Sequence, residues 1–151
     1  MVKFYNPIWD RRTIKHWLSD FEKEFSVNNL GDTILVGFSM GSLIALMLAE
    51  KFNFKKVLLA SLSPYFKNNI KDIPAEAGNF FGKNRMAAFS ELSRPEKIKC
   101  KSIFLFGDQD WPIAISQARE LASLYKGKFI LVKDTPHELT AEYIRIITVE
   151  A

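Results

Sequence analysis

The chain has 151 residues, of which 48% are hydrophobic, and this is enough for one domain with a sizeable core. Its net charge of +4 comes from basic residues spread along the sequence, so the charge pattern indicates neither nucleic-acid binding nor attachment to a membrane surface. The single cysteine, Cys100, cannot form an internal disulfide, and the first residues contain no apolar segment typical of a signal peptide. We therefore expect a single cytoplasmic domain over residues 1–151.

The N-terminal region is predicted to contain a short strand followed by a helix. The strand covers residues 2–5 and ends before Pro7, because proline cannot donate to a strand ladder. The helix is expected over residues 13–25 with Thr13 as its N-cap, since apolar residues recur there at helical spacing. This stripe consists of Ile14, Trp17, Leu18, Phe21 and Phe25. His16 lies off the stripe and is interpreted as an exposed histidine.

Residues 33–48, TILVGFSMGSLIALML, combine a predicted buried strand, an abrupt turn and a predicted helix. The turn contains the pattern GxSxG, from Gly37 to Gly41, which is typical of a nucleophile elbow with Ser39 at its apex. In an elbow the serine has a strained backbone and lies at a helix N-terminus, which favours developing negative charge. We expect both glycines to be required, because a side chain at either position would collide with the neighbouring strand or helix.

The same segment is apolar enough to raise the question of a membrane span. No charged residue occurs between Asp32 and Glu50. A span needs about 20 consecutive apolar residues, however, and the Gly-Phe-Ser-Met-Gly-Ser turn interrupts this one in its middle. We therefore predict no membrane span.

The remainder of the chain alternates between strands and helices. Strands are predicted over residues 56–62, 102–106 and 128–132, and helices over residues 83–92, 115–125 and 140–149. This alternation favours an α/β fold with a mostly parallel, five-stranded sheet and flanking helices. Residues 65–99 show no strong period and follow the end of a strand, where ligand-covering segments occur in open α/β sheets. They fit a small lid insertion and an ordinary connection equally well.

Three residues with catalytic chemistry each follow a predicted strand: Ser39, Asp110 and His137. The carboxyl ends of parallel strands lie at one edge of a sheet, so we expect these side chains to converge there. The chain order of serine, acid and histidine is that of the α/β-hydrolase triad.

In these features the sequence resembles the α/β-hydrolase superfamily, through GFSMGS at the elbow, FGDQDWPI around the acid and TPHEL around the histidine. The resemblance implies a shortened α/β-hydrolase fold that lacks strands found before the first helix of a complete member. It further implies Ser39 as nucleophile, His137 as general base and then acid, and Asp110 as the acid that orients the imidazole. Asp108 is the alternative acid.

The oxyanion hole implied by the resemblance is incomplete. The N–H of Met40, directly after the nucleophile, would be one donor. The strand whose loop supplies the second donor in the family is missing, and Ile8 or Trp9 could replace it. The loss of one donor can cost about a hundredfold in rate, which is compatible with weak activity.

The sequence therefore predicts a serine hydrolase that cleaves a small ester or thioester and needs no metal or organic cofactor. Aromatic residues near the expected pocket suggest a small apolar acyl group, although they could equally belong to the core; these are Phe38, Trp111, Tyr65 and Phe66. Two alternatives stay open, namely an inactive binding or interaction module and an acyltransferase with the same triad. Because most helices are expected on one face of the sheet, we also predict self-association, for instance as a homodimer.

Overall fold

The computed structural model of the protein describes residues 13–25, 30–73 and 75–151. The chain divides into two compact units. One unit consists of Met1–Asn29 and Tyr65–Arg94, and the other of Leu30–Pro64 and Pro95–Ala151. The role of residues 65–99 as a lid stays a prediction.

The first unit contains the helix α1 (Ile14–Glu24), the short 3-10 helix η1 (Ile70–Asp72) and the helix α3 (Ala75–Glu91). The helix α1 follows its predicted N-cap, Thr13, and His16 is exposed, as predicted. The His16 ring contributes to the cap, since its Nδ1 atom lies 2.9 Å from the Thr13 hydroxyl.

The element α3 consists of two helices that meet at Gly82. This glycine has a φ of 74°, which lies outside the helical range. Only the second of the two helices was predicted from the sequence. The first was missed because Gly78 and Gly82 lower the helix propensity of that stretch.

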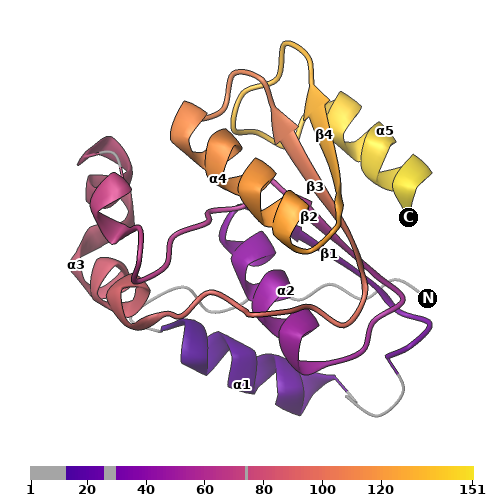
Figure 1. The fold of residues 1–151 in the computed structure, drawn as a ribbon, viewed down its shortest axis with the longest axis horizontal. Coiled ribbons are helices and arrows are strands. Elements are labelled where there is room, and N and C mark those ends of the chain that lie inside the picture. Colours follow the sequence, from indigo (N-terminus) through magenta and orange to yellow (C-terminus); the bar gives the residue numbers. More distant parts are fainter. Residues whose placement is uncertain (1–12, 26–29, 74) are drawn as a thin grey trace. The chain divides into compact units, whose positions relative to one another are not determined.

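The second unit is built on a four-stranded parallel sheet in the order β1-β2-β3-β4 (Figure 1). The strands are β1 (Ile34–Phe38), β2 (Lys56–Ala60), β3 (Lys101–Gly107) and β4 (Lys128–Val132). The mostly parallel sheet is thus confirmed, with four strands among the described residues. The remaining predicted strand, which is the first in the sequence at residues 2–5, lies outside the described residues.

Helices cover both faces of this sheet (Figure 1). Helix α2 (Met40–Lys51) packs on β1 and β2, and helix α4 (Pro112–Leu124) packs on β3 and β4. Helix α5 (Ala141–Glu150) covers the opposite face, where its Tyr143 joins a core cluster with Ala60, Leu105 and Val132. On β1, Val36 keeps 45% of its surface exposed. Self-association of the protein stays a prediction.

Two element boundaries differ from the predicted ones for identifiable reasons. Strand β2 ends at Ala60, two residues early, because Ser61 has a φ of 44° that a strand cannot contain. Helix α4 begins three residues early, at Pro112, because proline has the right φ for the first helical position and its missing N–H is not needed there.

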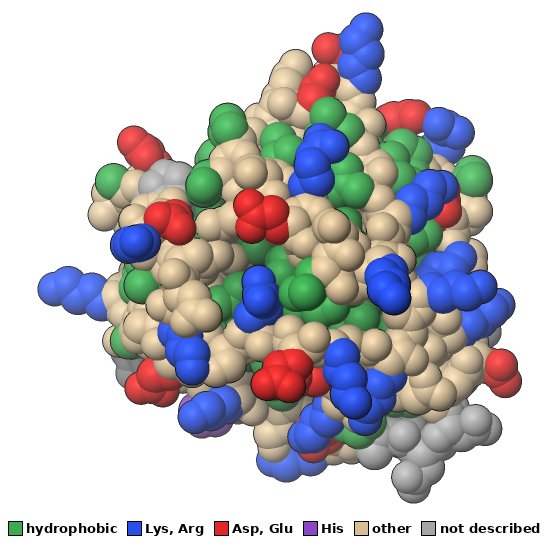
Figure 2. Space-filling model, in the orientation of Figure 1, with side chains coloured by type: hydrophobic (Ala, Val, Ile, Leu, Met, Phe, Trp, Pro, Cys, Tyr) green, Lys and Arg blue, Asp and Glu red, His purple; other side chains and the backbone are tan. Residues whose placement is uncertain are grey.

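The molecular surface carries charges of both signs. On the face in Figure 2, Lys and Arg side chains are interspersed with Asp and Glu rather than gathered into one basic patch. Within the described ranges, every helix is too short or too polar to cross a bilayer.

Candidate active site

Ser39 lies where β1 turns abruptly into α2. Its backbone has a φ of 53° and a ψ of −118°, a conformation that is uncommon for any residue other than glycine. The turn is held by the Ser39 N–H, which donates to the Ala60 carbonyl on β2 at 2.9 Å. This is the strained geometry that a nucleophile elbow requires.

The two glycines of the elbow have different roles. A Cβ atom on Gly37 would lie 2.6 Å from the Cα of Ser42, so only glycine lets β1 approach α2 this closely. A Cβ on Gly41 would have no described atom within 4 Å outside its own helix. The expectation that a side chain at Gly41 would collide with a neighbouring element is therefore wrong for the described residues.

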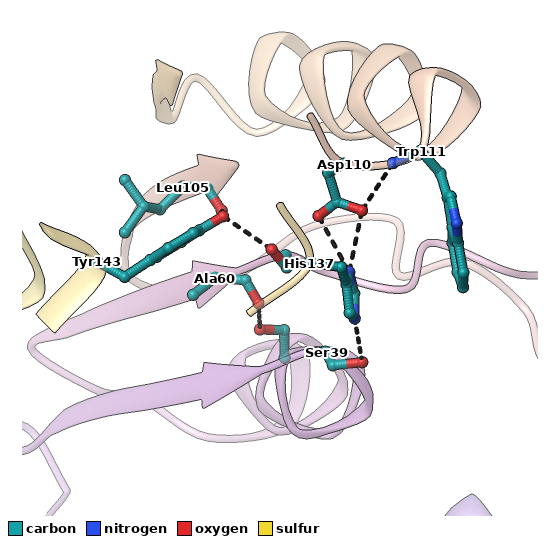
Figure 3. A network of polar contacts seen from close by, with 9 residues as sticks. Ser39, Ala60, Leu105, Asp110, Trp111, His137 and Tyr143 are labelled. Atoms are coloured by element: carbon teal, nitrogen blue, oxygen red, sulfur yellow. Dashed lines mark hydrogen bonds and ion pairs between the residues drawn. The ribbon is translucent and has the colours of Figure 1, made fainter. Parts of the chain in front are cut away.

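His137 stands between Ser39 and Asp110 in a continuous row of hydrogen bonds (Figure 3). Its Nε2 atom lies 3.0 Å from the Ser39 hydroxyl, and its Nδ1 atom lies 3.0 and 3.1 Å from the two oxygens of Asp110. The three residues come from the loops after β1, β3 and β4, and all belong to the second unit. The sheet thus brings together the three side chains singled out in the sequence.

The loops that carry Asp110 and His137 can meet because of Gly107 at the end of β3. A Cβ atom there would collide with the Thr135 carbonyl group, with only 2.7 Å to its carbon. The alternative acid, Asp108, lies in the same loop. Its carboxylate accepts the Thr135 N–H at 3.2 Å and so ties the two loops together, while Asp110 contacts the imidazole.

The Asp110 side chain is fully buried, whereas that of His137 is 29% exposed. Burial by itself would raise the pKa of the Asp110 carboxyl. The hydrogen bond and charge of His137 oppose this effect most strongly. The Ser61 hydroxyl and the Trp111 N–H, which lies 2.8 Å from Oδ1, add to it. The net result is a pKa of Asp110 below its ordinary value, so the buried carboxylate is charged at neutral pH.

Aromatic rings flank the imidazole. The Trp111 ring stacks on His137 with a centroid distance of 5.4 Å and an interplanar angle of 15°. The Phe38 ring lies 5.4 Å from the imidazole and 6.3 Å from the ring of Tyr143, so it also belongs to the core beneath α5. Both rings therefore restrict the orientation of His137, a function that the sequence did not suggest for them.

The other predicted site residues are not part of the row formed by Ser39, His137 and Asp110. Ile8, the candidate second oxyanion donor, lies outside the described residues. Tyr65 and Phe66 belong to the first unit, and their contact with substrate stays a prediction. Met40 is the first residue of α2, so its N–H has no acceptor within the helix. No group of three or more His, Cys, Asp or Glu side chains in the described part of the chain could hold a metal ion.

Two polar residues near the site were missed in the sequence. Ser61, directly after β2, is one of the groups that lower the pKa of Asp110, and its hydroxyl lies 2.8 Å from that of Tyr143 on α5. Neither residue belongs to a recognisable motif. Only the register of β2 against β3 and the packing of α5 bring them to the acid.

A parallel sheet with a strained serine elbow and a Ser-His-Asp row at its carboxyl edge defines the protein as an α/β hydrolase. The chain belongs to the FSH1 serine hydrolase family, whose model matches residues 21–139. No curated protein sequence matches the chain.

Solved structures of α/β hydrolases resemble the chain at low sequence identity. The α/β hydrolase MGS-MChE2, from the sediment metagenome of the Mar Chica lagoon in Morocco, has 13% identity and a TM-score of 0.63, with coverage of 97% of this chain and 73% of that one. A structure from a study of carboxylesterases of the thaumarchaeon Nitrososphaera gargenis has 12% identity and a TM-score of 0.66. The match covers 92% of this chain and 71% of that one. The type II thioesterase BorB from the borrelidin biosynthetic cluster has 18% identity, a TM-score of 0.58 and coverage of 89% and 67%. These likenesses establish the fold.

Proposed function

We propose that the protein hydrolyses a small carboxylic ester or thioester through an acyl-enzyme on Ser39. The observation that carries this proposal is the row of contacts Ser39–His137–Asp110, with distances of 3.0 Å on each side of the imidazole. Membership of a serine hydrolase family supports the reaction class. The esterase and thioesterase named among the structural neighbours support the substrate class.

In the first half-reaction, the Ser39 oxygen attacks the substrate carbonyl while His137 Nε2 accepts the hydroxyl proton. The resulting imidazolium is stabilised by the charged Asp110 carboxylate at Nδ1. His137 then gives the proton to the departing alcohol or thiol, and the acyl group stays on Ser39. In the second half-reaction, His137 takes a proton from water as the water oxygen attacks the acyl carbon. His137 then returns this proton to the Ser39 oxygen as the bond between that oxygen and the acyl carbon breaks, which releases the carboxylic acid and restores the Ser39 hydroxyl.

The negative charge on the tetrahedral intermediate would be held at the start of α2. The Met40 N–H is unpaired within the helix, and the helix dipole adds a partial positive charge at this end. One preorganised donor of this kind contributes about a hundredfold or more to the rate. The acyl group would lie near Phe38 and Trp111, the apolar rings beside His137.

A fluorophosphonate probe tests whether Ser39 is a live nucleophile. The wild-type protein should be labelled, and Ser39→Ala should not be labelled. Ser42→Ala is the matched control, because it removes a buried hydroxyl from the same helix that donates to the Ala60 carbonyl and not to His137. With p-nitrophenyl acetate, mass spectrometry should find one acetyl group on the peptide containing Ser39. A folded wild-type protein that the probe leaves unlabelled would contradict the proposal and favour a binding module.

A further inference from the structure

The loops after β3 and β4, which carry the acid and the histidine of the row, are joined by three hydrogen bonds. The Asp108 N–H donates to the Val132 carbonyl at 2.9 Å, and the Gln109 N–H donates to the Thr135 carbonyl at 3.1 Å. The Thr135 N–H donates to the Oδ1 atom of Asp108 at 3.2 Å. Two of the three bonds therefore fix Thr135, and only the last of them depends on a side chain.

The Asp108 side chain supplies an acceptor where the regular pairing of the strands ends. In a parallel ladder, backbone groups of neighbouring strands bond to each other at even spacing. Lys133 and Asp134 form a turn after β4, with a φ of 52° at Asp134, so the chain leaves the ladder before Thr135. Thr135 is only 2% exposed, and a buried N–H needs a partner. The Asp108 carboxylate is that partner.

This hydrogen bond lies close to the contact between the acid and the imidazole. Asp110 is two residues after Asp108, and His137 is two residues after Thr135. The residue between Thr135 and His137 is Pro136, whose ring fixes φ and leaves this short connection little freedom. A displacement of Thr135 should therefore also displace the imidazole, which lies 3.0 and 3.1 Å from the two carboxylate oxygens of Asp110.

We propose that Asp108 is a positioning residue: by holding Thr135, its carboxylate keeps the imidazole of His137 in contact with the catalytic acid. Asp108 thus acts on the triad without touching the imidazole. The inference rests on the proposed function, in which Asp110 serves His137 during acyl transfer.

Two substitutions of Asp108 separate the hydrogen bond from the charge. Asp108→Ala removes the acceptor, whereas Asp108→Asn removes the charge and keeps an oxygen that can accept the Thr135 N–H. With p-nitrophenyl acetate, kcat should fall about 100-fold in Asp108→Ala, the loss expected when a catalytic group is misplaced by about 1 Å. KM should stay within about twofold, and Asp108→Asn should lose less than about tenfold. Because Asp108 is exposed, both variants should fold.

A double-mutant cycle tests whether Asp108 acts through the acid. In the Asp110→Asn background, the carboxylate contact that Asp108 would position is already lost. Asp108→Ala should then lower kcat by less than about threefold, because residues that act as a unit are not additive. A role of Asp108 in general loop stability would instead lower kcat by a similar factor in both backgrounds.

Amide hydrogen exchange gives a readout that does not need an active enzyme. The Thr135 N–H should exchange faster in Asp108→Ala than in the wild type, because its acceptor is gone, and Asp108→Asn should restore slow exchange. Glu138→Ala is the matched control, since it removes an exposed acid next to His137 in the same pair of loops. This control should leave the exchange of Thr135 unchanged.

The two proposals fail separately. A folded wild-type protein that the fluorophosphonate probe leaves unlabelled refutes Ser39 as the nucleophile, and the exchange of Thr135 still reports on the hydrogen bond. If the wild type is labelled, equal kcat losses in Asp108→Ala and Asp108→Asn would overturn the role of Asp108. Equal losses for Asp108→Ala in the two backgrounds, or an unchanged exchange of Thr135 in Asp108→Ala, would overturn it as well.

Discussion

Replacement of Asp110 by asparagine tests which carboxylate serves His137. Nδ1 of the imidazole faces two carboxylate oxygens at 3.0 and 3.1 Å, which favours a hydrogen on Nδ1. In the proposed mechanism, Nε2 then accepts the proton of Ser39. Asparagine keeps the shape of the side chain but replaces one of these oxygens by an NH₂ group.

The local contacts decide which oxygen is replaced. The Trp111 N–H donates to Oδ1 at 2.8 Å, so the amide oxygen of Asn should stay there and the NH₂ should take the place of Oδ2. The NH₂ would then lie 3.1 Å from Nδ1 and compete with the amide oxygen, which stays 3.0 Å from it. Part of the protein would hold the tautomer with its hydrogen on Nε2, which cannot accept a proton from Ser39, and the neutral amide would no longer stabilise the imidazolium. Loss of the correct tautomer in a Ser-His-Asp triad costs about 10⁴-fold in kcat, and we expect a loss of about 10³ to 10⁴-fold here.

Asp108→Asn is the matched comparison. The Asp108 carboxylate accepts the Thr135 N–H at 3.2 Å, and an amide oxygen can accept the same bond. We therefore expect less than about a tenfold loss, equivalent to one weakened neutral hydrogen bond. The assay is turnover of p-nitrophenyl acetate at neutral pH, with thermal melting as a check that both variants fold. Equal losses in the two variants, or a larger loss in Asp108→Asn, would refute the assignment of the acid.

Three further predictions follow from the geometry. Gly37→Ala should lower the free energy of unfolding by about 3 kcal/mol, at the upper end of the range for overpacking, because its Cβ meets the backbone of α2. Gly41→Ala should be neutral or stabilising by up to about 1 kcal/mol. Urea unfolding measures both changes, and similar losses in the two variants would contradict this prediction. The pKa of Tyr143 is raised from 10.0 to about 12 in the folded protein, so its contribution to stability is complete below pH 10 and is lost as the pH rises toward 12. Between pH 10 and 12, the Tm of the wild type should therefore fall more steeply than the Tm of Tyr143→Phe. Parallel Tm curves for the two proteins would count against this prediction. Trp111→Ala should lower kcat more than it raises KM, since the ring stacks on His137; a change confined to KM would instead assign the ring to substrate binding.

The nature of the elements and the three central side chains could be read from the sequence. Strand β4 and the N-cap of α1 lie where the apolar periodicity and capping residues predict them, because these signals depend on near neighbours along the chain. Ser39, Asp110 and His137 could be found because each follows a strand and parallel strands present their carboxyl ends at one edge.

Only the tertiary structure decided how these residues are supported. The different clearances at Gly37 and Gly41 depend on the approach of α2 to β1, which no local pattern records. Ser61 and Tyr143 are 82 positions apart and carry no motif, yet their oxygens meet at 2.8 Å. The physical reason is that sequence patterns report which face of an element is apolar, whereas a buried polar contact depends on strand register and helix packing, which are set by the whole core at once.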